Sequence, residues 1–380
     1  MQLHVLRAEH NFGARNAARE GLVERRLRSF RPDIQPAVRS LACRHSRLAD
    51  LAVTFPALLV ALAVPRAGID ARPVIGQAIA GMPLTALSMA AGVPLWLRRF
   101  PPAYFSQTIP ILPDNHDFRR RIANHLPRSA KRAPAWLAAV ANSSAWGTEA
   151  LAIWIACNLV QNPEHVPLHR LRLVCLWAWF SGRTDAFAHR FIERPWNSEM
   201  LFATAVDAAN HWHTAIDLYA ELGDQVIGDM WAQPGSADGY EFVPLRSRAE
   251  LDEEARTMRN CVRTYGHALA HNNSRLWSIQ KDGRRIATLE LSCSGRDPLP
   301  NVFGLKAAGN KDVSIEVSLA ARRWLHAQDL ARMNIKPLEG DAVPLNRTTW
   351  TTLWKPYWIA KRRIPDWLPL TPSRHALADL

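Results

Sequence analysis

The chain has no Cys-x-x-Cys pair, no His-Glu-x-x-His motif and no apolar run as long as a transmembrane helix. Its five cysteines, at positions 43, 157, 175, 261 and 293, are odd in number and stand far apart. This excludes a zinc ribbon and a dithiol redox pair, and it indicates reduced, buried thiols. The longest apolar stretch, residues 51–64, is too short to cross a bilayer. We therefore expect a cytoplasmic protein with no metal, no cofactor and no membrane association.

Acidic residues are scarce relative to basic ones. The chain has 47 Lys and Arg against 34 Asp and Glu, which gives a net charge of +13 and a pI of about 10.1. Residues 1–47 and 98–139 each carry +6 and residues 320–380 carry +5, whereas residues 140–260 carry −7. This distribution favours either a polyanion-binding surface built from the basic segments or docking of those segments on the acidic middle of the chain.

Three basic clusters are candidates for phosphate contacts, because arginine and lysine side chains pair with phosphate oxygens and release counterions. The alternative for each cluster is a solvated helix face. In the C-terminal tail, tryptophans interleave with the cations, so the tail either faces nucleic acid or docks its rings on the body while its cations stay in water. The predicted nucleic-acid-binding residues are Arg25, Arg26, Arg28, Arg119, Arg120, Arg121, Lys131, Arg132, Lys361, Arg362 and Arg363.

Helical patterns dominate the first 235 residues. The 26 prolines predict many short helices that begin or end at Pro, and the 15 tryptophans are most simply core residues. Residues 200–222 predict one long helix. We predict an α+β fold that is predominantly α, with an irregular helical N-terminal region followed by a small α+β unit.

The α+β unit changes from helical to strand periodicity. Apolar positions recur every three or four residues from 247 to 270, and Ser247 with Glu250 forms a capping-box signature. Lys281-Asp282-Gly283-Arg284 predicts a hairpin turn, because the glycine of Asp-Gly accepts a positive φ without a steric penalty from a Cβ. We therefore expect a helix, a three-stranded sheet with a hairpin, and a second helix. The strands are expected at 276–280, 285–291 and 301–306, and the second helix at 313–330.

Three residues of this unit are candidates for catalysis. Cys261 and Tyr265 are four residues apart, which would place them on one helical face, and Glu290 is a carboxylate within an apolar strand. A cysteine nucleophile needs a base, and a buried carboxylate needs either a partner or a role. The alternative is that Cys261 is a core contact and Tyr265 hydrogen-bonds to the sheet.

Several motifs of the unit resemble the PcfJ-like family of conjugative-plasmid and phage proteins. The resemblance lies in Asn260-Cys261-Val262 with Tyr265, and in the strand segments Ser278-Ile279, Thr288-Leu289-Glu290 and Gly304 with Asn310. It covers about a sixth of the chain. Gln280 and Val302 depart from the family pattern, which has Arg and Gln there. The resemblance implies a role in a mobile genetic element but no defined reaction.

The predicted domains are a helical, Trp-rich domain at 1–235, a PcfJ-like α+β domain at 236–335 and a basic-aromatic tail at 336–380. The predicted function is a nucleic-acid-binding accessory protein of a mobile element, with DNA or RNA as its partner. Two alternatives stay open. One is an enzyme acting on nucleic acid or nucleotide through Cys261, Tyr265 and Glu290. The other is a protein-interaction subunit of a larger complex.

Overall fold

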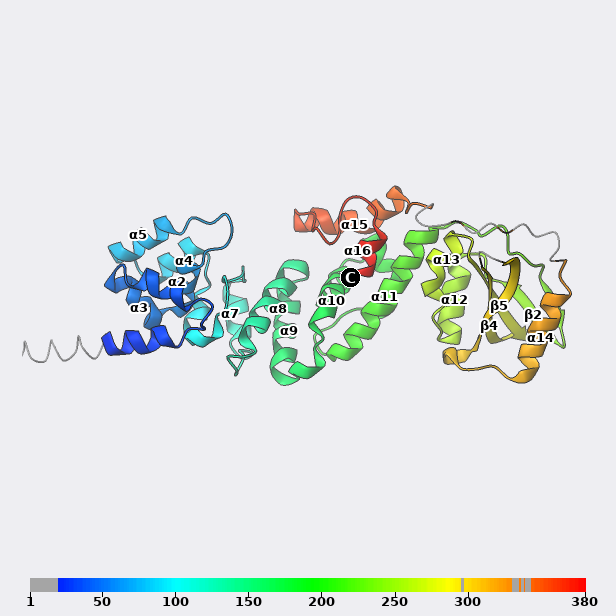
Figure 1. Ribbon diagram of the computed structural model, residues 1–380, viewed down its shortest axis with the longest axis horizontal. Coiled ribbons are helices and arrows are strands. Elements are labelled where there is room, and N and C mark those ends of the chain that lie inside the picture. Colours follow the sequence, from blue (N-terminus) through cyan, green and yellow to red (C-terminus); the bar gives the residue numbers. More distant parts are fainter. Residues whose placement is uncertain (1–19, 295–296, 330–334, 336–337, 339–342) are drawn as a thin grey trace, which may run out of the picture. The chain divides into compact units, whose positions relative to one another are not determined.

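The computed structural model describes residues 20–294, 297–329, 335, 338 and 343–380, which form two compact units. The first unit comprises residues up to 179 together with 196–205, and the second comprises 180–195 and 206–380. The described chain is predominantly helical with one antiparallel sheet (Figure 1), which confirms the predicted fold class. These units do not coincide with the predicted domains 1–235, 236–335 and 336–380, whose boundaries stay predictions.

The first unit consists of short helices, many of which begin at a proline because the missing amide hydrogen of proline costs nothing in a first turn. Residues 20–28 are helical. The further helices and short 3-10 turns are α2 Gln35–Ala42, α3 Ser46–Thr54, α4 Pro56–Ala63, α5 Arg72–Ala80, α6 Leu84–Ala91, η1 Leu95–Arg99, η2 Pro102–Tyr104, α7 His116–Ile122, α8 Ala133–Trp146, α9 Glu149–Gln161, η3 Pro163–His165, η4 Leu168–Arg170 and α10 Leu171–Ser181.

Aromatic rings fill the core between α7 and α8. The Trp96 ring lies 6.3 Å from the Trp136 ring and 5.8 Å from the Phe100 ring, both in edge-on arrangements. Trp136 is 2% exposed. Each buried aromatic ring removes a large apolar area from water, so the contact between Trp96 and Trp136 fixes where α8 begins relative to η1. The tryptophans of this region are core residues, as the composition predicts.

The helical part of the second unit contains η5 Phe187–Phe191, α11 Phe202–Leu222, α15 Arg347–Lys361 and α16 Arg374–Ala378. The tail helix α15 buries Trp350, Trp354 and Tyr357. The Trp354 ring lies 5.9 Å from the Phe180 ring and 6.2 Å from the Trp212 ring. The tail tryptophans therefore dock on the body, as one of the two alternatives for the tail predicts.

The sheet of the second unit has five strands in the order of the sequence, each antiparallel to its neighbours. The strands are β1 Gly235–Ala237, β2 Tyr240–Pro244, β3 Ser274–Lys281, β4 Arg284–Ser294 and β5 Asp297–Ala307. The prediction of three strands is wrong, because β1 and β2 extend the sheet beyond β3. β1 has three residues and lies in a Gly- and Ser-containing segment, where the sequence shows a loop pattern and no strand periodicity.

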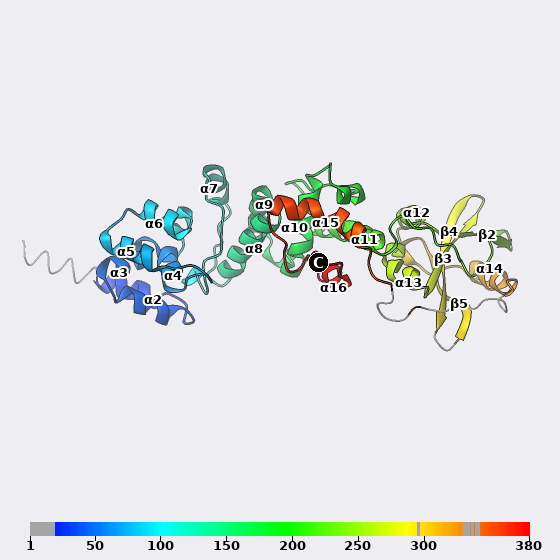
Figure 2. The same ribbon diagram turned by 90° about the horizontal axis from the view of Figure 1, so that it is seen from above.

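Helices cover both faces of the sheet. Figures 1 and 2 show α14, Ile315–His326, on one face, and α12, Arg248–Met258, with α13, Gly266–Ala270, on the other. Trp324 of α14 stacks on Phe242 with ring centroids 4.5 Å apart. On the other face, Leu251 of α12 and Leu276 of β3 belong to one buried hydrophobic cluster. The sheet residues that face α12 and α13 are therefore enclosed.

The predicted helix at 247–270 is wrong in one respect, because it is broken. The capping box of Ser247 and Glu250 starts α12 as predicted, but Arg259 takes a positive φ of 49° and ends it. A short 3-10 turn, η6 Val262–Tyr265, and α13 follow. Cys261 therefore lies outside α12 and does not share a helical face with Tyr265.

The hairpin prediction is confirmed. Lys281 pairs with Arg284 across a two-residue turn in which Asp282 has φ 51° and Gly283 has φ 72°. Two positive φ values are the pattern that matches the twist of antiparallel strands. None of the helices in the described part of the chain combines the length and the apolar character that a membrane crossing needs.

Candidate functional site

A row of polar side chains crosses the sheet on the face toward α12 and α13. Residues directly opposite each other in an antiparallel pair point to the same face. Ser278 is opposite Thr288, and Glu290 is opposite both Leu276 on β3 and Gly304 on β5. Sequence motifs that lie far apart in the chain are thereby brought into one enclosed layer.

Glu290 is 7% exposed, and both of its carboxylate oxygens accept hydrogen bonds. The Tyr265 hydroxyl donates to Oε2 at 2.9 Å, and the Ser274 hydroxyl donates to Oε1 at 2.8 Å. Burial and then the hydrogen bond to Glu290 raise the pKa of Tyr265 above its usual value, so the phenol keeps its proton. Tyr265 therefore hydrogen-bonds to the sheet, as one of the alternatives predicts. Its partner is Glu290, the carboxylate that the sequence indicates as a candidate site residue.

A second buried carboxylate, Glu254 of α12, lies in the same layer and is 0% exposed. The Thr288 hydroxyl donates to its Oε1 at 2.6 Å, and Arg285 Nε forms an ion pair with its Oε2 at 2.9 Å. Thr288 in turn accepts a hydrogen bond from the Asn260 amide at 2.8 Å. Burial raises the pKa of Glu254, and hydrogen bonds from Thr288 and Ser278 oppose that rise.

Glu254 is not among the residues predicted from the sequence, although the sequence contains a signal for it. Glu254 is three residues after Leu251 and four before Met258, so it lies on the apolar face of α12. A carboxylate at such a position must be paired when the helix packs. This signal is the same kind of argument that identifies Glu290 within its strand.

Cys261 does not join the Tyr265–Glu290 pair by any hydrogen bond in the described residues. Its thiol is exposed and donates to the Asn310 side-chain oxygen at a distance of 3.7 Å. An amide cannot take up the thiol proton, so this contact provides no general base for a cysteine nucleophile. The structure therefore brings together Tyr265 and Glu290, and separately Cys261 and Asn310.

The basic residues of the first cluster and of the tail are at the surface. Arg25, Arg26 and Arg28 are exposed on the helix at 20–28, and Arg28 pairs with Glu24 at 2.9 Å. In the tail, Arg362 and Arg363 are exposed, and Arg362 takes a positive φ of 49° at the end of α15. The Lys361 ammonium lies 5.9 Å from the Tyr357 ring.

The arginines of α7 are exposed but partly neutralised. Arg119 pairs with Asp114 at 2.7 Å, and Arg120 and Arg121 both pair with Asp117, at 3.1 and 3.6 Å. Exposed ion pairs of this kind contribute little energy, so a phosphate can displace the acid at small cost.

Arg119 and Arg120 line a cavity of about 430 Å³ together with two further arginines, Arg98 and Arg99, which the sequence analysis did not select. We call this the α7 cavity; Leu95, Trp96, His116, Ile122, Ala123 and Leu126 complete its lining. The signal for Arg98 and Arg99 was present, because they belong to the same +6 segment, residues 98–139.

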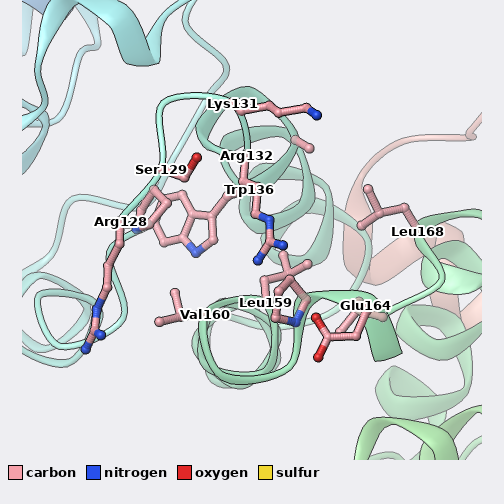
Figure 3. A pocket seen from close by; sticks show the side chains of 13 residues that line it. Arg128, Ser129, Lys131, Arg132, Trp136, Leu159, Val160, Glu164 and Leu168 are labelled. Atoms are coloured by element: carbon pink, nitrogen blue, oxygen red, sulfur yellow. The ribbon is translucent and has the colours of Figure 1, made fainter.

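Lys131 and Arg132 line a second cavity, of about 450 Å³, at the N-terminal end of α8 (Figure 3). We call it the α8 cavity. One side is formed by Pro127, Arg128, Ser129, Lys131, Arg132, Ala135 and Trp136. The other side is formed by Leu159, Val160, Pro163, Glu164, Val166 and Leu168. Arg128, Lys131 and Arg132 are exposed and form no ion pair in the described residues.

A third charged cavity, of about 380 Å³, lies in the second unit and differs from these two. Its arginines Arg248 and Arg263 both pair with Asp252, at 2.8 and 2.9 Å, and Arg263 also pairs with Glu193 at 2.6 Å. Asp252 is 14% exposed in its side chain. Arg248 and Arg263 are therefore paired with acids of the same lining, and they hold α12 in place more than they offer free charge.

Within the residues that the structure describes, no three His, Cys, Asp or Glu side chains are grouped so that they could hold a metal ion. No protein-family model matches the chain, and comparisons with curated proteins and with solved structures give no match.

Proposed function

We propose that the chain is a nucleic-acid-binding accessory protein, and that the first unit provides the binding surface. The observation that carries the proposal is that the α7 and α8 cavities are lined by seven cations, and that each cavity also has a tryptophan ring in its lining. These cations are Arg98, Arg99, Arg119, Arg120, Arg128, Lys131 and Arg132. The resemblance to PcfJ-like proteins supports the further proposal that the chain serves a mobile genetic element.

Phosphate binding at this surface has a favourable energy balance. Among the described residues, Arg128, Lys131 and Arg132 have no acidic partner to give up. Asp114 and Asp117, the acids paired with Arg119 and Arg120, are 31% and 61% exposed in their side chains. Each cation that contacts a phosphate releases condensed counterions, which gives affinity without base recognition. The contacts named here read no bases, so the proposal is one of sequence-independent binding.

The test is a titration of fluorescein-labelled single-stranded and double-stranded DNA and RNA, followed by fluorescence anisotropy over a range of salt concentrations. We expect the logarithm of the affinity to fall linearly with the logarithm of the salt concentration. The variant Arg128→Glu/Lys131→Glu/Arg132→Glu should bind at least about tenfold more weakly and with a shallower salt slope.

The matched control has the same change in net charge at exposed cations of the second unit. It is the variant Arg284→Glu/Lys311→Glu/Arg322→Glu. The control is expected to keep most of the affinity, because bound phosphates do not contact those positions. Absence of binding at low salt, or an equal loss in both variants, would contradict the proposal.

The Tyr265–Glu290 contact supports a second candidate, an enzyme acting on nucleic acid or nucleotide. Glu290 is a buried carboxylate with a phenol donor at 2.9 Å, which is an arrangement that can hold a proton in place. Both oxygens of Glu290 are already satisfied, so a reacting group would have to displace either Tyr265 or Ser274. The nucleic-acid-binding proposal requires no such displacement.

A further inference from the structure

The α8 cavity differs from a general basic surface because it has two chemically distinct sides. Arg128, Lys131 and Arg132 lie on one side with the Ser129 hydroxyl, and four aliphatic side chains lie on the other. The aliphatic residues are Leu159, Val160, Val166 and Leu168. A volume of about 450 Å³ is in the range of small-ligand pockets. The ligand that matches these sides has a strong anionic group attached to a body that can pack against aliphatic side chains.

The charged side is reinforced by the start of α8. The helix has 14 residues and begins without a side-chain cap, because the residue before it is Arg132. Pro134 has no amide hydrogen. In the described residues the Ala135 amide has no hydrogen-bond partner, whereas the amides of Ala133 and Trp136 bond to backbone oxygens. Unpaired amides and the helix dipole together attract an anion.

A buried hydrogen-bond donor, the indole N–H of Trp136, also belongs to the lining of the cavity. Trp136 is 2% exposed, and its indole N–H has no hydrogen-bond partner in the part of the chain that the structure describes. In Figure 3 the indole nitrogen faces the space between Arg132 and Val160, within the cavity that these residues line. An unsatisfied buried N–H costs about 1–3 kcal/mol, so an acceptor atom that enters the cavity would remove this cost. The neighbouring Trp96 differs in this respect, since its N–H donates to the Pro113 carbonyl oxygen at 3.1 Å.

The charge of the cavity selects the kind of phosphate. Three cations oppose one carboxylate, Glu164, whose own contact is with His165 at 3.5 Å. A phosphomonoester carries between about −1.5 and −2 charges at neutral pH, whereas a phosphodiester carries one. The terminal phosphate of a strand or of a mononucleotide therefore fits this charge better than an internal phosphate does.

We propose that the α8 cavity binds a nucleotide phosphomonoester, with the phosphate at Lys131, Arg132 and the start of α8 and the nucleoside against the aliphatic side. The phosphomonoester has two sources, a free nucleoside monophosphate and the phosphorylated end of a nucleic-acid strand. For the strand end, the inference rests on the proposed function. For the free nucleotide, it stands independently of that function.

The experiment compares short single-stranded oligonucleotides that carry a 5′-phosphate, a 3′-phosphate or only hydroxyl ends, with the label within the strand. Adenosine monophosphate and adenosine are the competitors. At about 0.15 M salt we expect one phosphorylated end to bind about tenfold more tightly than hydroxyl ends. Adenosine monophosphate should compete with that strand, and adenosine should not.

Two variants with equal charge changes locate the effect. Lys131→Gln/Arg132→Gln should remove the preference for a terminal phosphate. Arg119→Gln/Arg120→Gln in the α7 cavity should weaken the binding of all strands equally and should keep the preference for a terminal phosphate. Trp136→Phe, which keeps the ring and removes the N–H, should reduce the preference several-fold, and circular dichroism would confirm that it is folded.

The outcomes separate this inference from the proposed function. Equal, salt-dependent binding of phosphorylated and hydroxyl ends would overturn the inference and leave the proposed function standing. Binding of adenosine monophosphate without binding of any strand would overturn the proposed function and support the inference. Failure to bind either the mononucleotide or any strand would overturn both.

Discussion

Gly304 lies directly opposite Glu290 across β4 and β5, and a Cβ at position 304 would be 2.9 Å from the Oε2 atom of Glu290. That oxygen is the one that accepts the hydrogen bond of the Tyr265 hydroxyl. The absence of a side chain at 304 is therefore what lets the carboxylate lie flat on the sheet beneath Tyr265. Two motifs of the sequence, Gly304 and Glu290, are parts of one packing arrangement.

Gly304→Ala is the first prediction. The added methyl would displace Glu290 from Tyr265 and Ser274, and we expect a loss of about 1–3 kcal/mol in the free energy of unfolding. Gly76→Ala is the control, because Gly76 is within α5 and a Cβ there meets nothing within 4 Å. That control should stabilise the protein by about 0.5–1 kcal/mol, since alanine is the better helix former. Chemical denaturation measures the change in the free energy of unfolding for both variants. Changes of the same sign in the two variants would contradict the predicted clash at Gly304.

Glu290→Gln is the second prediction, and it concerns Tyr265. The pKa of Tyr265 is raised first by burial and then by Glu290, so a neutral amide at 290 removes the second cause and keeps the first. The phenol of Tyr265 should then ionise at lower pH than in the parent protein, but still above the usual pH for tyrosine. Ultraviolet absorbance titration measures this, with Tyr265→Phe identifying the signal. An unchanged titration would show that the contact is not formed in solution.

The same substitution also tests the enzyme candidate. If Glu290 takes part in a reaction on nucleic acid or nucleotide, Glu290→Gln should abolish that activity while circular dichroism stays unchanged. If Glu290 only holds Tyr265 and Ser274, the substitution should reduce stability by about 1 kcal/mol and leave activity intact. The two outcomes exclude each other for any activity that the parent protein shows.

Local sequence signals predicted the features that depend on neighbouring residues. The capping box of Ser247 with Glu250 and the hairpin turn at Asp282-Gly283 are both present, because each is decided within four residues. The burial of Trp354 is not of this kind, because it depends on Phe180 and Trp212, which are far away in the sequence. The sequence therefore predicts a structural feature when the residues that cause it are close neighbours in the chain.

Features that depend on distant contacts were not predicted. Arg259 adopts a positive φ although it is not glycine, and nothing in the residues around it signals the break that separates α12 from η6. The α7 cavity joins Arg98 to Arg119, which requires knowledge of how α7 packs. The unpaired indole N–H of Trp136 is likewise visible only once α8 and α9 are in place.

Thr288→Val is the third prediction. Valine has the shape of threonine but lacks the hydroxyl that donates to Glu254 and accepts from Asn260. Two buried polar groups would lose a partner, so we expect a destabilisation of about 2–4 kcal/mol. Thr352→Val removes an exposed hydroxyl on α15 and should change stability by no more than about 0.5 kcal/mol.

A double-mutant cycle that combines Thr288→Val with Asn260→Ala tests the hydrogen bond between these two side chains. Because the Asn260 amide and the Thr288 hydroxyl contact each other at 2.8 Å, their effects on the free energy of unfolding should not add. Additive effects would show that Asn260 acts elsewhere. Denaturation by urea, followed through tryptophan fluorescence, measures all the variants of the cycle.

Asp217 of α11 is the subject of the last prediction, a change of stability with pH. Burial, and then the negative charge of Glu221, raise the pKa of Asp217 to about 6, while Arg374 opposes the rise. Because the folded-state pKa is above the unfolded value of about 3.9, folding favours the protonated acid. This stabilisation is fully present below about pH 4 and is lost as the pH rises through about 6.

Asp217→Asn should remove this dependence, because an amide carries no charge at any of these pH values. We expect the variant to be more stable than the parent protein at about pH 7.5, by about 2 kcal/mol, and to lose that advantage at about pH 4. Asp207→Asn, at an exposed position of the same helix, has the same charge change and should show no such advantage. Calorimetric unfolding over this pH range decides the matter. A gain for Asp217→Asn that is the same at both ends of the range would show that the pKa of Asp217 is not raised in the folded protein and that the gain has a cause other than the charge of Asp217.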